Sequence, residues 1–129
     1  MSERDGGSSS VEFALVLPLA LLAALAVLQV GLVAKDALVV VQAAREGVRE
    51  AAVSTDDIRA RDAALRGGSL PADRTDVEVT RAGSVGDPVT VTVRYRAPFL
   101  VPFVDWLFPD RVELRASATM RQEASEPGP

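Results

Sequence analysis

The side chains that most enzymes and metal sites depend on are scarce in this sequence. Its 129 residues include no cysteine and no histidine, which excludes disulfides, thiol nucleophiles, imidazole bases and zinc sites built from Cys and His. Acidic pairs occur in segments expected to be loops or caps, at Asp56-Asp57, Asp73/Asp76 and Asp105/Asp110. Such pairs usually cap helices or shape turns. We therefore predict no catalytic residue, no metal site and no cofactor.

The overall charge and composition narrow the function further. The chain has 14 Lys and Arg against 18 Asp and Glu, a formal net charge of −4. A nucleic-acid partner would call for a basic surface, so none is expected. No glycine-rich loop that could cradle a phosphate is present, and we expect no small-molecule substrate. Apolar residues make up 48% of the chain, and they are unevenly spread.

One carboxylate stands apart because of its position. Glu12 lies immediately before a long apolar run, and a carboxylate that enters hydrocarbon costs about 2–4 kcal/mol on insertion scales. One explanation is a capping box, in which Ser9 is the N-cap of a helix and Glu12 folds back at N3. The other is a buried carboxylate that needs a positively charged partner.

The apolar run predicts a membrane-spanning helix. It continues from Phe13 for 16 residues and, after Gln29, extends to Ala34, giving 22 residues without a charge. As a helix this run measures roughly 33 Å, enough to cross a bilayer core. A cleaved secretory signal is the competing interpretation, but such a signal has a shorter apolar region after a positive segment. Gln29 could hydrogen-bond a neighbouring helix or lie near the outer interface.

Beyond the run, the sequence predicts two further helical segments. From 36 to 53 the apolar residues recur at helical spacing, at Val40, Val41, Ala44, Val48, Ala51 and Ala52. Residues 54–57 predict a break and a new N-cap, followed by a short helix to about Arg66. Gly67-Gly68 is expected to stop this helix.

The remaining elements alternate with the period of β-strands. Apolar and polar residues alternate over 77–80, 89–96 and 112–121, which predicts three half-buried strands. We expect an antiparallel sheet with a helix over its apolar face. The fold class is therefore α+β: a long N-terminal transmembrane helix continues into an amphipathic helix that packs on a small three-stranded antiparallel sheet. The tail, 122–129, is polar and expected to be disordered.

Most of the aromatic residues lie together between the last two strands, at Phe99, Phe103, Trp106 and Phe108. They could form an exposed patch for a partner subunit or for the outer leaflet, where Trp prefers the interface. They could also fold over the open end of the small core, which is the interpretation that we favour.

The start of the apolar run resembles a processing site of type IV prepilins. Gly7 is followed by four residues, then by Glu12 and the aromatic Phe13. The resemblance implies that a prepilin peptidase cuts between Gly7 and Ser8, so that residues 1–7 are a leader and Glu12 is the fifth residue of the mature chain. In that family the glutamate is thought to neutralise the amino terminus of a neighbouring subunit.

Two longer blocks resemble TadE-like proteins of the tight-adherence (Flp) pilus system. The first is Ser10 to Pro18, SVEFALVLP, and the second is Gln42 to Arg49, QAAREGVR. The resemblance implies a pilin-like fold and a role as a minor pilin or pseudopilin, with other pilin-like subunits and the pilus assembly platform as partners. Pro18 matches the family's proline and is expected to kink the transmembrane helix. An unprocessed, single-pass accessory or sensor subunit is the alternative.

The resemblance also implies an orientation in the membrane. The leader would be in the cytoplasm and the helix (8–35) in the cytoplasmic membrane of a bacterium, with the head (36–121) outside. The charges next to the apolar run indicate the opposite orientation, because Lys35, Arg45 and Arg49 follow it and only Arg4 precedes it. We adopt the orientation that the resemblance implies, because four charged residues are a weak basis for assigning the orientation.

Overall fold

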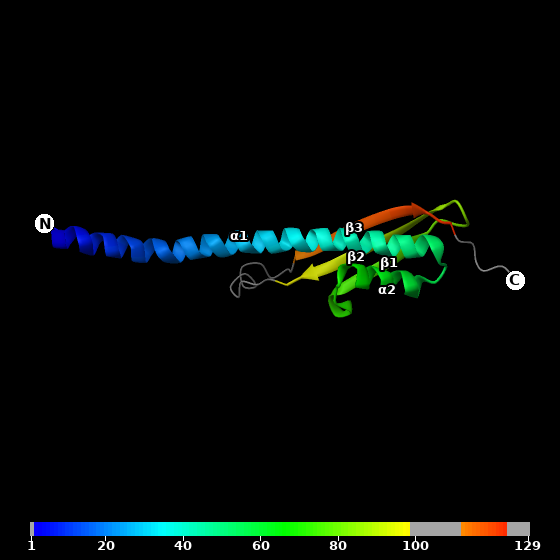
Figure 1. Ribbon diagram of the computed structural model, residues 1–129, viewed down its shortest axis with the longest axis horizontal. Coiled ribbons are helices and arrows are strands. Elements are labelled where there is room, and N and C mark those ends of the chain that lie inside the picture. The colour runs from blue at the N-terminus through cyan, green and yellow to red at the C-terminus, as the bar shows by residue number, and fades with distance from the viewer. Residues whose placement is uncertain (1, 99–111, 124–129) are drawn as a thin grey trace.

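The chain forms one long helix that projects far beyond a small α+β head (Figure 1). The computed structural model describes residues 2–98 and 112–123. Its elements, in chain order, are α1 (Ser2–Val53), α2 (Asp57–Gly68), a short 3₁₀ helix η1 (Ala72–Arg74), and the strands β1 (Thr75–Arg81), β2 (Pro88–Ala97) and β3 (Val112–Arg121). The predicted α+β fold, with its long apolar helix and three-stranded antiparallel sheet, is confirmed.

The helix α1 begins earlier than the capping-box interpretation requires. It is 52 residues long, about 78 Å at the usual rise per residue. Ser9 lies well inside it, whereas an N-cap residue stands at the helix boundary with non-helical backbone angles. The prediction that Ser9 caps the helix is therefore wrong for the full-length chain, because residues 2–8 continue the helix in front of it.

The break after α1 occurs where the sequence predicts it. Asp56 is the N-cap of α2, and its Oδ1 accepts a hydrogen bond of 3.0 Å from the backbone N–H of Ile58. The predicted stop at Gly67-Gly68 is wrong, since both glycines belong to α2. The helix ends instead at Ser69, which adopts a left-handed backbone conformation with φ 51°.

These two glycines serve close packing between the helices. A Cβ atom on Gly67 would lie 2.6 Å from Cγ of Glu46, and one on Gly68 would lie 3.0 Å from Cβ of Ala43. Both distances are shorter than a normal carbon–carbon contact of about 3.5–4.0 Å. A side chain at either position would therefore push α2 away from α1.

Small residues continue this close contact along both helices. They recur every four positions, as Ala43, Gly47 and Ala51 on α1 and as Ala60, Ala64 and Gly68 on α2. A Cβ atom on Gly47 would lie 2.9 Å from Cβ of Ala64 and 2.9 Å from Cγ1 of Val91 on β2. Gly47 therefore lies where α1, α2 and the sheet meet.

The buried face of α1 differs from the predicted one at three positions. Ala43 and Gly47 are buried, although the helical pattern did not select them, and Val41 is 38% exposed although it was expected inside. The reason is that α1 packs against α2 as well as against the sheet, which turns the buried face toward the smaller residues. The other predicted core positions are buried.

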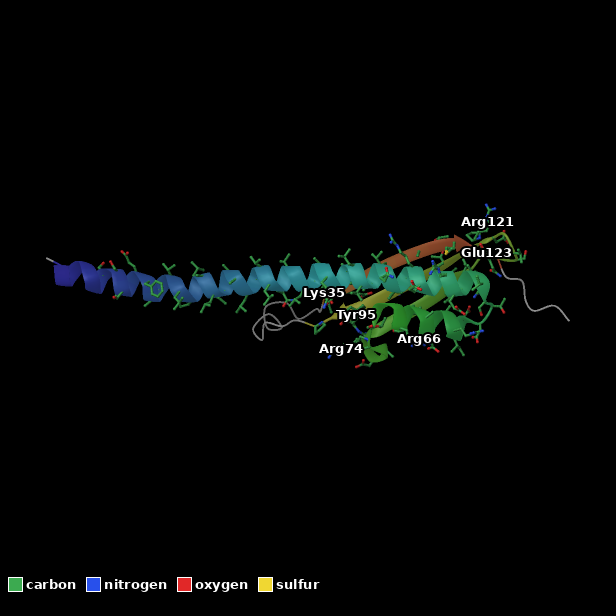
Figure 2. All side chains as sticks on the ribbon, in the orientation of Figure 1. Lys35, Arg66, Arg74, Tyr95, Arg121 and Glu123 are labelled. Atoms are coloured by element: carbon green, nitrogen blue, oxygen red, sulfur yellow. The ribbon has the colours of Figure 1, made fainter. Side chains whose placement is uncertain are left out.

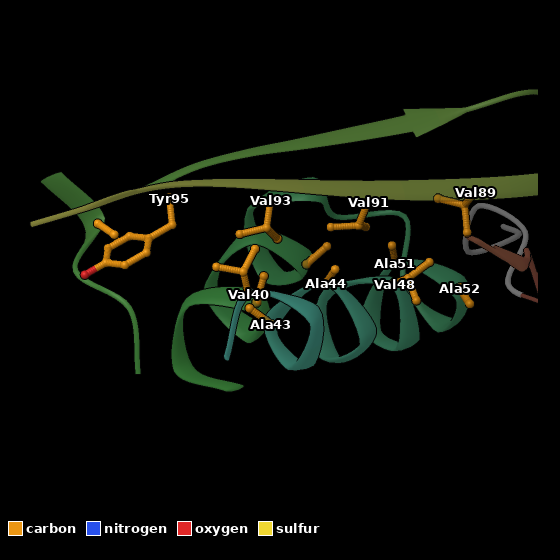
Figure 3. Packing of buried hydrophobic residues seen from close by; sticks show 13 residues of the cluster. Val40, Ala43, Ala44, Val48, Ala51, Ala52, Val89, Val91, Val93 and Tyr95 are labelled. Carbon is orange, nitrogen blue, oxygen red and sulfur yellow. The ribbon is translucent and has the colours of Figure 1, made fainter. Parts of the chain in front are cut away.

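The sheet is an antiparallel meander with the order β1-β2-β3. Val77 on β1 pairs with Val93 on β2, and Val91 on β2 pairs with Ala118 on β3. The central strand packs its buried residues onto α1 (Figure 3), namely Val89, Val91, Val93 and Tyr95. The predicted alternation in all three strands is confirmed, and β3 has the predicted bounds.

The ordered head extends two residues further along the chain than predicted, to Glu123. The tail was expected to be disordered from residue 122, but Gln122 is buried and its N–H donates to the carbonyl of Asp87 at 2.8 Å. The N–H of Glu123 donates to the carbonyl of Ala52 at 2.8 Å. These two residues therefore belong to the head, and residues 124–129 lie outside the described part.

Arg81, at the end of β1, joins the ends of both helices. Its Nη1 and Nη2 atoms donate to the carbonyl oxygens of Ala51 and Ser54, at 2.9 and 2.8 Å. Its Nε atom forms an ion pair of 2.9 Å with Asp57. The last carbonyls of a helix have no partner within the helix. One guanidinium therefore closes the end of α1 and holds the start of α2 and the end of β1 beside it.

We expect Arg81→Ala to destabilise the head by about 2–3 kcal/mol, because two part-buried, charge-assisted hydrogen bonds to carbonyls are lost. The more exposed pair with Asp57 adds little. The measurement is chemical denaturation of the purified chain. The control is Arg94→Ala, which removes an exposed pair with Glu78 at 3.9 Å and should change stability by no more than about 0.5 kcal/mol. Equal losses in the two variants would contradict the role of Arg81.

Candidate functional site at the start of the apolar helix

The residues of the predicted processing site lie on one uninterrupted helix. Gly7, Ser8, Glu12 and Phe13 all belong to α1 and are exposed. Ser8 and Glu12 are four residues apart, so they lie on the same face one turn from each other. Among the residues whose side chains are described, Glu12 forms no ion pair. Any charge that pairs with it would therefore come from outside this part of the chain.

Gly7 has no structural role that its surroundings explain. A Cβ atom built on it would meet nothing within 4 Å, and its backbone does not adopt a positive φ. Within a helix, glycine is less favourable than alanine by about 1 kcal/mol. Gly7 differs in this from Gly47, Gly67 and Gly68, where a side chain would clash. The folded chain itself therefore gives no reason for a glycine at position 7.

Among the described residues, nothing covers the apolar part of α1 over residues 13–28, where the large side chains are exposed, with Phe13 at 67%, Leu15 at 73% and Val27 at 73%. Leu32 and Val33, near the end of the run, are half-buried. The helix is long and apolar enough to cross a membrane, and none of its most hydrophobic 18-residue stretch is buried. A core helix of a soluble domain would bury this surface. One long apolar helix of this kind fits a single-pass membrane anchor.

Pro18 lies inside this apolar stretch, between exposed leucines at positions 17 and 19. Because proline has no N–H, the carbonyl of Ala14 lacks its usual partner in the helix. The helix continues on both sides of this position (Figure 1). The kink expected from the sequence stays a prediction.

The second block that resembles the pilus family has a packing role in the head. Ala43, Ala44, Gly47 and Val48 face the core and are buried, whereas the arginines between them are exposed. The contacts of Gly47 with α2 and β2 explain the need for small residues here. The sequence signal for this contact is the spacing of four between small residues on both helices, which apolar periodicity does not reveal because glycine and alanine add little to it.

Among the described residues, the acidic pairs of the head serve capping and packing. Asp56 caps α2 and Asp57 pairs with Arg81, while Asp105 and Asp110 lie outside the described residues. Within the described part of the chain, no three acidic residues gather as metal ligands would. The open groove between α1 and β3 is lined by residues such as Gln42, Arg45 and Thr119, which form no catalytic arrangement.

The aromatic residues of the predicted partner patch cannot be placed. Phe99, Phe103, Trp106 and Phe108 all lie outside the described residues. The structure describes only the two positions that flank their segment, Ala97 at the end of β2 and Val112 at the start of β3, which pair with each other. The prediction for these aromatic residues therefore stays open.

Comparison with known proteins agrees with the resemblance found in the sequence. Residues 7–49, which contain the whole candidate site and the packing block, match the family described as TadE-like protein. No curated protein and no solved structure matches the chain. The matched segment covers 43 of the 129 residues.

Proposed function

We propose that this TadE-like protein is a minor pilin or pseudopilin that takes part in assembly of a Flp-type pilus after a prepilin peptidase has cut between Gly7 and Ser8. The observation that carries the proposal is Gly7 itself. It stands five residues before Glu12 and a long exposed apolar helix, at a position where the fold needs no glycine. A protease that reads this residue supplies the missing reason. The function is non-enzymatic.

The proposed topology follows from the same site. The leader remains in the cytoplasm, where the peptidase acts, and the apolar part of α1 spans the cytoplasmic membrane of a bacterium. The head lies outside. The rod of exposed apolar side chains then contacts lipid before assembly and the helices of other pilin-like subunits and of the assembly platform during it. Packing of helix against helix supplies the contact energy.

Glu12 has a defined task in this proposal. Cleavage creates a positively charged amino group on Ser8, at the same end of the helix as the carboxylate. Between packed helices both charges leave water, and each then needs an opposite charge close by. We assign Glu12 to pairing with the amino group of Ser8 on a neighbouring subunit, and Phe13 to the apolar contact beside it.

The test of cleavage is Gly7→Val. A branched side chain at the residue before the scissile bond is expected to abolish processing, so that the chain isolated from cells keeps its leader and migrates as the longer form. The matched control is Gly31→Val, because a Cβ atom at Gly31 also meets nothing within 4 Å. The control should be cut normally. Normal cleavage of the Gly7→Val chain would overturn the assignment of the site.

One observation favours a second function, that of an uncut membrane-anchored accessory or sensor subunit. The helix α1 passes without interruption through Gly7 and Ser8, and proteases generally need an extended segment at the bond that they cut. Two consecutive glycines at positions 6 and 7 weaken this turn of helix, so local unwinding there is the least costly. The second function requires that the chain isolated from cells retains residues 1–7.

A further inference from the structure

We propose that one end of the head rests on the phospholipid headgroups of the same membrane that α1 spans. We call this end the basal surface and define it by Lys35, Arg74 and Arg96. The proposal depends on insertion of α1 into a membrane, which is part of the proposed function. It does not depend on cleavage after Gly7 or on pilus assembly.

The continuity of α1 fixes the height of the head. The apolar run ends at Ala34, and the first fully buried core residue of the head, Val40, follows six residues later on the same helix. Six helical residues rise about 9 Å, and one headgroup layer is roughly 5–8 Å thick. No flexible linker separates the two parts, so the base of the head begins at the level of the headgroups.

The central strands bring the sheet to the same level. In the core, Val93 lies beside Val40, and Tyr95 lies further toward the apolar part of α1 (Figure 3). The strand β2 continues from Val93 to Ala97, about 13 Å along an extended chain before any tilt. Ala97 pairs with Val112, where β3 begins. The end of β2 and the start of β3 therefore approach the plane in which the apolar run ends.

The side chains at this end suit lipid phosphates. Figure 2 shows Lys35 and Arg74 near the base of the head, whereas Arg66 lies farther along the head and Arg121 lies at the opposite end. Arg96 joins the basal group because its Nη2 atom donates to the carbonyl of Asp73 in η1, at 3.3 Å.

Among the described residues, the carboxylates at the same end are Asp36, Asp73 and Glu113, so the net charge of the basal surface is small. Contact with lipid phosphates therefore depends on how far the positively charged side chains extend. Lysine and arginine extend their charge along a flexible stem, as they do at membrane interfaces. A guanidinium also binds phosphate with two parallel hydrogen bonds. Lys35 is exposed, and it forms no ion pair within the described residues. The expected ligand is therefore the lipid phosphate group.

The absence of cysteine makes the proposal directly testable. Full-length chain, leader included, is reconstituted into nanodiscs with one fluorescent label at Ala72→Cys on the base or at Val85→Cys in the exposed β1–β2 turn. Lipids with a spin label on the headgroup quench the fluorescence. We expect quenching at position 72 to be at least threefold stronger than at position 85. Equal quenching at both positions would overturn the proposal.

Two further arms separate the possible causes. Quenching at position 72 in discs of phosphatidylcholine alone, as well as in discs with phosphatidylglycerol, is expected for contact with the phosphate. Quenching only in the second lipid supports the contact and assigns it to lipid charge. A label at Val27→Cys, quenched by spin labels on the acyl chains, reports whether α1 is inserted. Insertion without quenching at position 72 refutes the basal contact and leaves the proposed function intact.

A charge-reversal variant tests the named residues. Lys35→Glu combined with Arg74→Glu and Arg96→Glu should reduce quenching at position 72 at least twofold. The matched control reverses three exposed arginines away from the base, Arg59, Arg61 and Arg121, and changes the net charge equally. A loss of quenching of the same size in the control would show that overall charge, and not the basal surface, governs the contact.

Discussion

Glu12→Ala should leave the chain cleaved after Gly7 but reduce its incorporation into assembled pili at least 100-fold. The substitution removes the carboxylate that we assign to the amino group of Ser8 on a neighbouring subunit. An unpaired charge within packed apolar helices costs about 3–5 kcal/mol, and 1.4 kcal/mol corresponds to a factor of about ten in an equilibrium. The measurement compares the variant and the original chain in sheared pilus fractions and in membranes.

A second glutamate supplies the control for this experiment. Glu78 lies on the exposed face of β1, far along the chain from the membrane helix, and it forms a long ion pair of 3.9 Å with the guanidinium of Arg94. Glu78→Ala should be cleaved and assembled as the original chain is. If Glu12→Ala is assembled normally while its cleavage is unchanged, the charge-pairing role of Glu12 is refuted.

Gly47→Leu should be among the most destabilising single substitutions in the head. A Cβ atom alone would lie 2.9 Å from both Ala64 and Val91, and leucine adds three more carbon atoms in the same space. Overpacking of a tight core typically costs about 1–3 kcal/mol and occasionally more, so we expect a loss of at least about 3 kcal/mol. Denaturation followed by circular dichroism, with the membrane helix held in detergent, measures this loss.

The control for the packing prediction is again Gly31. It lies on the same helix, and a Cβ atom there meets nothing within 4 Å. Gly31→Leu should therefore leave the stability of the head unchanged. Similar losses in the two variants would show that the effect comes from the helix itself and not from the contact of α1 with α2 and β2.

Local patterns in the sequence were sufficient for most elements of the head. Alternating residues predicted the three strands because each strand buries one face, and Asp56 predicted the start of α2 because its side chain caps the helix. The prediction that Gly67 and Gly68 end α2 was wrong because glycine near the end of a helical pattern usually indicates that the helix terminates there. Their true role depends on Glu46 and Ala43, which lie more than twenty residues earlier in the chain.

Long-range partners also explain why Arg81 was not predicted. Its acceptors, on Ala51, Ser54 and Asp57, are 24 to 30 residues away in sequence, and nothing in its neighbours on β1 indicates them. The alternation of β1 places Arg81 on the same face as Val77 and Val79, toward the helices, but it does not identify the acceptors. Only the packing of both helices on the sheet brings the three acceptors around one guanidinium.

The candidate site was visible in the sequence because it is contiguous. Gly7, Ser8, Glu12 and Phe13 lie within seven residues, and their meaning comes from their order before an apolar run. What the structure adds is a contrast between glycines. Those at positions 47, 67 and 68 are needed for packing, and the glycine at position 7 is not. Because Gly31 also meets nothing within 4 Å, the processing assignment depends on the order of Gly7, Glu12 and Phe13 before the apolar run together with this contrast.

The amino terminus of the protein isolated from its native membrane tests the central claim most directly. Mass spectrometry or N-terminal sequencing of the intact chain identifies it without a variant. Processing by a prepilin peptidase predicts a chain that begins at Ser8. A chain that begins beyond residue 20 would indicate a secreted protein released by signal peptidase. A chain that begins at Met1, or at Ser2 after loss of Met1 alone, would contradict cleavage after Gly7.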